Sequence, residues 1–279
     1  MQIYVGTSGF QYAHWNNGVF YPRGVKDRLA YALDRFDAIE INSTFYSIPR
    51  PETVAAWAAG LSGKSKLVLK APQSVSHRRR LKLQSDPGIK QGLDLLNYFI
   101  DGCLTIPAAN RGPVLIQLPG SMAINLPRLE PVLQVFAERD LRVALEIRHA
   151  SWFDNGTFAL LEKYGAALVA SDWTEFKTPL VLTSDFLYIR RHGPGSMYSS
   201  AYDDDALRSD VTQLLDQPVR EAYVFFNNDI HGYAPKNAMR MIELIEEQAR
   251  PIQVAANFRI GNPGVGLPPS AAGFAVEGD

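Results

Sequence analysis

Eight short apolar runs recur along the chain, and polar or charged residues follow each of them. They lie at residues 2–6, 37–41, 66–71, 113–118, 142–147, 166–171, 186–191 and 222–227. Parallel strands that are buried on both faces have such continuous apolar sequences, and in a (β/α)8 barrel the carboxyl ends of the strands line the face that carries function. The runs therefore predict eight barrel strands with one functional mouth.

Amphipathic helical patterns separate most of these runs. They lie at 26–35, 51–60, 87–101, 127–139, 155–164, 204–216 and 235–249, and several begin with a proline or a capping residue. Alternation of strand and helix implies right-handed crossovers and a parallel sheet, so the predicted fold is an α/β TIM barrel. The connection from Trp173 to Ser184, between the sixth and seventh strands, is too short and proline-interrupted for a full helix. An open doubly wound sheet is therefore the alternative fold.

The length of 279 residues fits one barrel better than two domains. We expect residues 1–260 to form a single TIM-barrel domain and the Gly/Pro-rich residues 261–279 to form a C-terminal tail. The 28 basic and 29 acidic side chains leave no overall field that would draw the chain to nucleic acid or to a membrane. Cys103 is the single cysteine, and we expect it on the buried side of a helix. Because the chain has no long apolar segment, the sequence predicts a cytoplasmic protein without a membrane anchor.

Strand side chains alternate with a period of two, so alternate residues at the end of a strand face the same side. This parity predicts that three pairs point toward the mouth: Glu40 with Asn42, Glu146 with Arg148, and Arg190 with His192. Lys70 adds another cation near the same depth. Carboxylates among cations are typical of acid–base chemistry on an anion, and an ion-pair network that neutralises the barrel interior is the alternative interpretation.

All five histidines follow predicted strands: they are His14, His77, His149, His192 and His231. Beside acidic residues such a set indicates a catalytic or a metal-binding role. Arginine and lysine at the same mouth would repel a divalent cation, and the chain has no His-Glu-x-x-His motif. We therefore assign no metal ligands and favour an anion bound by guanidinium groups.

The run from His77 to Lys82 is the densest basic cluster, and it follows the third strand. Together with Trp15, Tyr46 and Trp152, this run suggests a patch that contacts phosphates, with aromatic rings that stack on bases or sugars. The simpler interpretation is a solvent-exposed segment that leads into the next helix. Gly6-Thr-Ser-Gly9 matches neither the dinucleotide fingerprint nor the P-loop, so no nucleotide cofactor is expected.

A series of ordered motifs resembles the YecE-like family, domain of unknown function 72, over nearly the whole chain. The motifs are Val5-Gly-Thr-Ser-Gly9, Glu40-Ile-Asn-Ser-Thr-Phe-Tyr46, Lys70-Ala-Pro72, Gln117-Leu-Pro119, Glu146-Ile-Arg-His149 and Tyr223-Val-Phe-Phe-Asn-Asn-Asp229. The resemblance implies a TIM barrel and no established activity. The architecture is similar to sugar isomerases and apurinic endonucleases, but those use clustered carboxylate and histidine metal ligands, whereas here the mouth is mixed with arginine and lysine.

The first hypothesis is an enzyme whose anionic substrate, a phosphorylated sugar or a phosphodiester, is bound by Arg148, Arg190 and Lys70. Proton transfer would fall to Glu40 or Glu146, with His192 or His149 as the partner. The other substrate-binding candidates are Asn42, Gln117, Asp172, Asn228, Asp229, Trp15, Tyr46 and His77.

Two other classes of function remain open at this point. One is a non-catalytic protein that binds nucleic acid or a small anion through residues 77–82 and the aromatic rim. The other is a metal-dependent hydrolase or isomerase that would use Glu40, Glu146, Asp172, His192 and Asp229. The sequence decides neither the substrate nor the oligomeric state.

Overall fold

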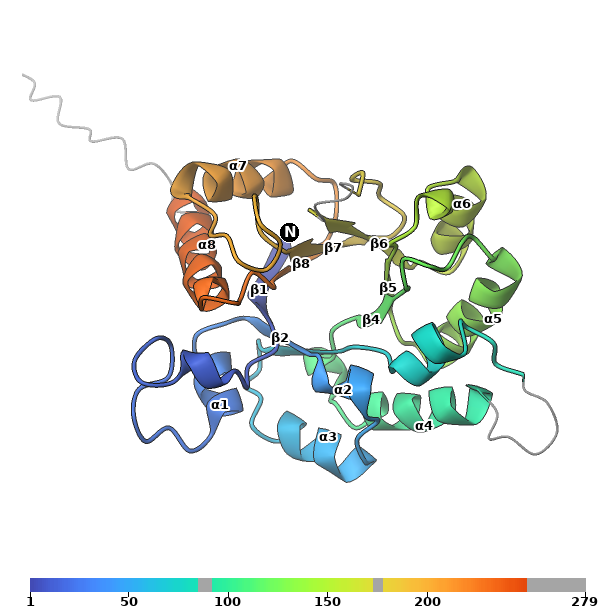
Figure 1. Cartoon of the computed structure of the whole chain (residues 1–279), viewed down its shortest axis with the longest axis horizontal. Coiled ribbons are helices and arrows are strands. Elements are labelled where there is room, and N and C mark those ends of the chain that lie inside the picture. The colour runs from blue at the N-terminus through green and yellow to red at the C-terminus, as the bar shows by residue number, and fades with distance from the viewer. Residues whose placement is uncertain (85–91, 173–177, 250–279) are drawn as a thin grey trace, which may run out of the picture.

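The computed structural model describes residues 1–84, 92–172 and 178–249, which form a ring of parallel strands surrounded by helices (Figure 1). The strands are β1 (Gln2–Ser8), β2 (Ala38–Ile41), β3 (Lys66–Leu69), β4 (Val114–Gln117), β5 (Val143–Glu146), β6 (Ala167–Ser171), β7 (Phe186–Arg191) and β8 (Glu221–Phe226). Their order in the sheet is β3-β2-β1-β8-β7-β6-β5-β4. Each strand coincides with a predicted run, so the strand prediction is confirmed.

Backbone hydrogen bonds at the two ends of β3 and β4, donated by residues that flank these strands, close the sheet into a barrel. The amide of Gly112 donates to the Leu67 carbonyl and the amide of Ala71 donates to the Leu115 carbonyl, both at 2.8 Å. An open doubly wound sheet would leave these two edge strands without partners. The closure therefore confirms the TIM barrel and excludes the alternative fold.

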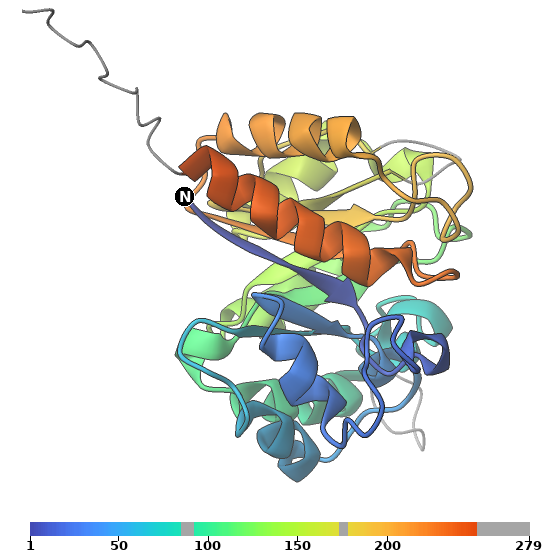
Figure 2. The ribbon, with the colours of Figure 1, turned by 90° about the vertical axis from the view of Figure 1, so that its left-hand side faces the viewer.

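Helices follow most of the strands on the outside of the barrel. The α-helices are α1 (Arg28–Leu33), α2 (Ser43–Tyr46), α3 (Pro51–Ala58), α4 (Gly92–Leu104), α5 (Leu126–Ala137), α6 (Asn155–Lys163), α7 (Asp204–Leu215) and α8 (Tyr233–Ala249). Figure 2 shows α8 running alongside β1. Residues 178–184 between β6 and β7 form no helix, while residues 173–177 and the expected tail at 261–279 lie outside the described residues.

Side-chain caps explain where four of these helices begin. Asp27, Asn125, Asp154 and Asp203 each accept a hydrogen bond from a backbone amide in the first turn of α1, α5, α6 and α7, respectively. Such caps satisfy amides that have no partner within the helix.

No helix among the described residues is long and apolar enough to cross a bilayer.

Two apolar layers build the core, one between barrel and helices and one inside the barrel. Cys103 lies in the outer layer, on α4, as predicted. The inner layer comprises Tyr4, Ala38, Val68, Leu115, Ala144, Ala167, Val169, Phe186, Tyr188, Tyr223 and Phe225. Towards the carboxyl ends of the strands, the next inward positions are polar, as at Ser8, Glu40 and Arg190. The apolar plug is therefore the floor of a polar mouth.

Candidate functional site

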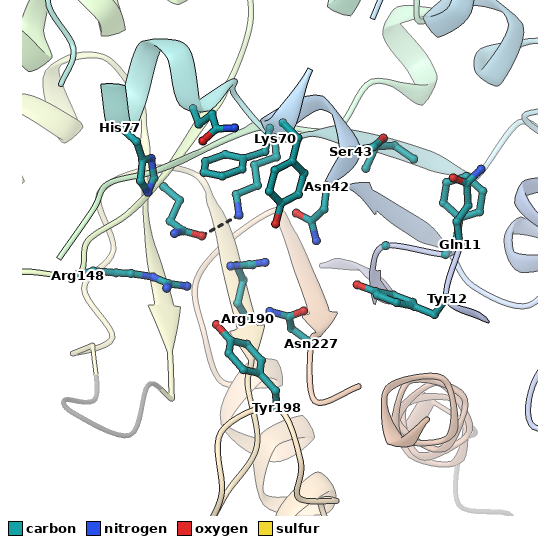
Figure 3. A pocket seen from close by; sticks show the side chains of 17 residues that line it. Gln11, Tyr12, Asn42, Ser43, Lys70, His77, Arg148, Arg190, Tyr198 and Asn227 are labelled. Atoms are coloured by element: carbon teal, nitrogen blue, oxygen red, sulfur yellow. Dashed lines mark hydrogen bonds between the residues drawn. The ribbon is translucent and has the colours of Figure 1, made fainter. Parts of the chain in front are cut away.

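A cavity of about 700 Å³ opens at the carboxyl ends of the strands (Figure 3). Its basic lining residues are Lys70, His77, Arg148 and Arg190. Its amide and aromatic lining residues are Gln11, Asn42, Gln73, Gln117, Asn227, Phe10, Tyr12, Phe45, Tyr46 and Tyr198. No aspartate or glutamate is among the described residues that line it. The described lining therefore carries basic side chains and no acidic ones, although the whole chain has a formal net charge of -1.

Arg190, at the end of β7, joins two buried carboxylates beneath the cavity. Its Nε and Nη2 donate to Glu40 at 3.1 and 2.8 Å, and its Nη1 donates to Glu146 at 2.5 Å. Nη2 also lies 3.3 Å from Ser8 Oγ, and the Tyr188 hydroxyl donates to Glu40 at 2.5 Å. Burial opposes the charge of Arg190, but Glu146 and Glu40 outweigh it and raise the pKa of the guanidinium above its usual range.

Glu146 also holds Arg148 in place. The Nε and Nη2 of Arg148 lie 2.9 and 2.8 Å from Glu146 Oε1, and the arginine side chain is 15% exposed. Burial alone would raise the pKa of Glu146, but Arg190 and Arg148 outweigh it and hold that pKa well below its usual value. Glu146 is therefore a fixed anion beneath the cavity.

Glu40 and Glu146 do not have the geometry expected of the acid–base pair. Neither carboxylate lines the cavity, and both are occupied by guanidinium donors. Their observed contacts are ion pairs: both carboxylates bind Arg190, and Glu146 also binds Arg148. This arrangement matches the ion-pair network that was the alternative interpretation of the sequence.

Lys70 enters the cavity from the end of β3 without a carboxylate partner. Its Nζ donates to Gln117 Oε1 at 2.8 Å and lies 4.5 Å from the centre of the Phe45 ring. No ion pair of the described residues joins Lys70 to an acid. Burial, followed by the charge of Arg190, lowers the pKa of Lys70 from 10.5 to about 7. The amine therefore exchanges its proton near neutral pH.

Three more of the predicted residues reach the same cavity. The His77 ring packs edge-on against Phe45, and burial together with the charge of Lys70 lowers the pKa of His77 to about 4, so this ring is neutral at pH 7. Asn42 Oδ1 is buried without a hydrogen-bond partner among the described residues. Tyr46 is 74% exposed at the rim.

Trp15 and Trp152 correct the expectation of an aromatic rim. Both are 0% exposed, and each indole N–H is used within the protein. Trp15 donates to Asp229 Oδ1 at 2.6 Å, while Trp152 donates to the Met122 carbonyl at 2.7 Å. Tryptophan combines a large apolar ring with one donor, and here both properties are satisfied in the core. Neither ring is available to stack on a ligand.

The side chains of four other predicted residues form hydrogen bonds within the loops and do not line the cavity. Asp172 accepts from the His192 amide at 2.7 Å and from the Tyr202 hydroxyl. Asn228 donates to the Ser200 carbonyl and to Asn237, and Asp229 binds His14 as well as Trp15. His149 lies 2.8 Å from Ser151 Oγ and caps a short turn. These contacts fix the loops that surround the mouth.

His192 lies behind the cavity wall. Its side chain is 0% exposed, with Nε2 3.7 Å from Glu146 Oε1 and Nδ1 3.2 Å from Asn227. Burial outweighs the attraction of Glu146 and lowers the pKa of His192, so the ring is neutral. Tyr198 packs edge-on against it and faces the cavity.

The metal-dependent hypothesis receives no support from the arrangement of these side chains. No three His, Cys, Asp or Glu side chains of the described residues converge as metal ligands. Glu40 and Glu146 bind guanidinium groups, whereas Asp172 and Asp229 bind separate loops. The donor set therefore does not fit a metal ion at this mouth.

Several cavity residues escaped the sequence prediction. Asn227 has the same inward parity as Tyr223 and Phe225 on β8, so the alternation of that strand carried the signal. Tyr12 and Tyr198 come from loops beyond the strand ends, where no periodic pattern locates a side chain. Of the basic run, His77 lines the cavity, while Arg80 donates to Ser121 at 3.0 Å.

The comparisons with known proteins agree on one family. The model of the protein family described as "Protein of unknown function DUF72" matches residues 4–258 of this chain. The UPF0759 protein YecE of Escherichia coli K12 is 26% identical over 157 residues, which are 55% of this chain and 51% of that protein. The match therefore spans about half the length of this curated relative.

Two solved structures are similar over most of the chain. A DUF72 family protein from Thermotoga maritima has 26% identity and a TM-score of 0.73, covering 88% of this chain and all of that one (100%). A DUF72 family protein from Enterococcus faecalis has 19% identity and a TM-score of 0.72, covering 88% of this chain and 96% of that one; at this identity it shows the fold alone.

Proposed function

The chain belongs to the DUF72 family of proteins of unknown function, and we propose that it is an enzyme that binds a small anionic substrate in the cavity at the mouth of its barrel. The lining of the cavity carries this proposal. Lys70, Arg148 and Arg190 face the same space from three strand ends, and no carboxylate of the described residues shares it (Figure 3). A planar guanidinium binds carboxylate and phosphate well, particularly where water is partly excluded.

The ion-pair network supports the same proposal through its charge balance. Arg190 and Arg148 together offset Glu40 and Glu146, so the buried network is neutral. Lys70 lies outside it, and an anion in the cavity would complete the pairing of this amine. Protein interiors favour such paired charges over isolated ones.

We assign proton transfer in this enzyme to Lys70 in place of Glu40, Glu146 and the histidines. An effective acid–base group has a pKa near the working pH, and the pKa of Lys70 is about 7. Its Nζ lines the cavity, whereas His192 is 0% exposed and both glutamates are held by Arg190. Among the described lining residues, Lys70 is therefore the group whose pKa suits proton exchange near pH 7.

Thermal denaturation tests the anion site. Sulfate and inorganic phosphate at low millimolar concentration, where their general stabilising effect is small, are expected to raise the melting temperature above that in sodium chloride of equal ionic strength, because a bound anion stabilises the folded state. Arg148→Ala should abolish most of the increase, while Arg139→Ala, an exposed substitution on another part of the barrel, should retain it. Equal melting temperatures in sulfate, phosphate and chloride would contradict the proposal.

Nucleic acid is the second candidate ligand, favoured by the exposed side chains around the rim. Tyr46 is 74% exposed, and Arg78 and Lys82 are exposed beyond His77. Each phosphate contact contributes about 0.7–0.9 to the slope of log affinity against log salt. Arg78→Ala with Lys82→Ala should therefore flatten the slope for a single-stranded oligonucleotide; an unchanged slope would exclude this surface.

A further inference from the structure

The amine of Lys70 is placed as a nucleophile. Nζ faces the cavity, donates to the neutral Gln117 side chain at 2.8 Å and is covered on one side by the Phe45 ring at 4.5 Å. Lysines that form covalent intermediates share such surroundings, because removal from water and nearby cations favour the neutral amine. Arg190 and Arg148 are the nearby cations here, and both lower the pKa of Lys70, which is about 7.

We propose that Lys70 forms an imine with the aldehyde or ketone group of a substrate that also carries a carboxylate or phosphate. This inference rests on the proposed function, because the anion site must hold the substrate, and it names the substrate class. Arg148 lines the same cavity and is fixed by Glu146, so it is the group that would bind the anionic end. Figure 3 shows Lys70 and Arg148 directed into the space between them.

The reaction balances without a further reactant. The lone pair of the neutral amine forms a bond to the carbonyl carbon, and the carbonyl oxygen takes up the proton that the nitrogen releases, which gives a carbinolamine. The carbinolamine then loses its hydroxyl group and the second nitrogen proton as one water molecule, and an imine remains. No electron donor or acceptor is consumed in either step.

Charge explains why the substrate must be an anion. A protonated imine is a cation, and here it would lie beside Arg148 and Arg190 with no carboxylate among the described residues of the lining. A carboxylate or phosphate on the substrate offsets this charge within the same cavity. An uncharged aldehyde offers no such compensation, so it should react at Lys70 far more slowly.

Lys66 provides a matched control within the same strand. Both lysines point into the barrel from β3 and both are 8% exposed. The Nζ of Lys66 donates to the Ala109 carbonyl at 2.8 Å near the opposite end of the barrel, and Lys66 does not line the cavity. A comparison of the two separates the effect of the cavity from that of burial.

Reductive trapping tests the proposal on the full chain. Glyoxylate and sodium cyanoborohydride at pH 7 should convert Lys70 to a stable secondary amine, located by mass analysis of peptides. We expect Lys70 to react at least about tenfold faster than Lys66 or the exposed lysines, since each unit of pKa depression gives about tenfold more neutral amine. Glycolaldehyde phosphate in place of glyoxylate distinguishes a phosphate from a carboxylate substrate, and acetaldehyde tests the need for an anion.

The variants and the competitor define the outcomes. Lys70→Arg and Lys70→Met should each lose the fast label, Lys66→Met should keep it, and sulfate should slow it. If a Lys70 variant fails to fold, the peptide map of the unaltered chain decides alone. Uniform labelling of all lysines would overturn the imine proposal. If sulfate stabilises the protein in a way that Arg148→Ala abolishes but Lys70 is not labelled, the imine fails and the anion site stands. If no Arg148-dependent stabilisation by sulfate is found either, the proposed function fails as well.

Discussion

At the scale of single residues, the pairing of Arg190 with two carboxylates has consequences for stability. The guanidinium is 1% exposed, and Glu40 and Glu146 are 0 and 1% exposed. Removal of one member of such a network leaves buried charges without partners, which typically costs about 3–5 kcal/mol. We therefore expect Arg190→Met to lower the free energy of unfolding by roughly that amount in urea denaturation.

The matched control for Arg190→Met removes the charges together. Glu40→Gln combined with Arg190→Met should recover most of the lost stability, because Glu146 keeps Arg148 as its partner and no buried carboxylate is then unpaired. Additive losses across the two substitutions would show that the side chains contribute separately. That result would contradict the network described here.

Lys70 presents the opposite case, because its burial favours the neutral form. Its pKa falls from 10.5 to about 7, so between these pH values the unfolded chain binds more protons than the folded chain and stability rises with pH. Replacement by methionine removes this penalty, which is fully present below pH 7 and is lost as the pH rises to 10.5. Each unit of pKa shift corresponds to about 1.4 kcal/mol of stability, but Lys70→Met also removes the hydrogen-bond donor of Gln117, which offsets part of the gain. Lys70→Met should therefore stabilise the protein at pH 6 by roughly 2–4 kcal/mol.

Urea denaturation of Lys70→Met at pH 6, 8 and 10 checks this prediction. The stabilisation should shrink steadily across the series. Lys236→Met, an exposed substitution on α8, is the control and should change stability little at any of the three pH values. A destabilised Lys70→Met protein at pH 6 would mean that the amine is better solvated than its 8% exposure indicates.

At the scale of elements, Gly6 allows β1 and β2 to pair closely. A Cβ at this position would lie 1.7 Å from the Ala38 carbonyl oxygen, so the two strands would have to separate. Overpacking of this kind typically costs about 1–3 kcal/mol, and backbone displaces less readily than a side chain. Gly6→Ala should therefore lower the melting temperature by several degrees, whereas Gly63→Ala, with nothing within 4 Å of its Cβ, should not. Equal melting temperatures for the two variants would show that β1 moves away from β2 without a loss of stability.

Elements with a sustained pattern could be predicted from the sequence, and short ones could not. The strands β1 to β8 and seven of the helices have apolar periodicity over a full element. The four-residue helix α2 and the π-helical turn at Ser74–Arg78 are too short to show a period, yet they carry Phe45 and His77 into the cavity. The conformation of these turns depends on packing against the barrel and not on local sequence.

The same division applies to the site as a whole. Strand parity placed Asn42, Arg148 and Arg190 at one mouth, the ends of two further strands added Lys70 and Gln117, and all five line the cavity. Parity does not say which of two neighbouring charges pairs with the other, so it could not show that Glu40 and Glu146 are neutralised below the cavity. Loop residues such as Trp15 and Asp229 have no parity at all, and their mutual hydrogen bond was not predictable.

At the scale of the whole molecule, anion binding and protonation of Lys70 should be linked. Sulfate is the suitable probe, because its charge is constant between pH 6 and 9 whereas that of phosphate changes. Below pH 7 the amine is already protonated, and above pH 7 the bound anion must draw a proton onto it, so the dissociation constant should rise by up to about tenfold per pH unit. Titration calorimetry should therefore show proton uptake at pH 8 that disappears in Lys70→Met, whose weaker affinity should be independent of pH.

An unaltered chain whose affinity for sulfate does not change between pH 6 and 9 would mean that Arg148 binds the anion alone. Imine formation needs the neutral amine, whose fraction rises by up to about tenfold per pH unit below pH 7 and levels off above it. Glyoxylate labelling should therefore increase up to about pH 7 and then level off, whereas sulfate binding weakens above pH 7. A common midpoint near pH 7 would identify Lys70 as the group responsible for both.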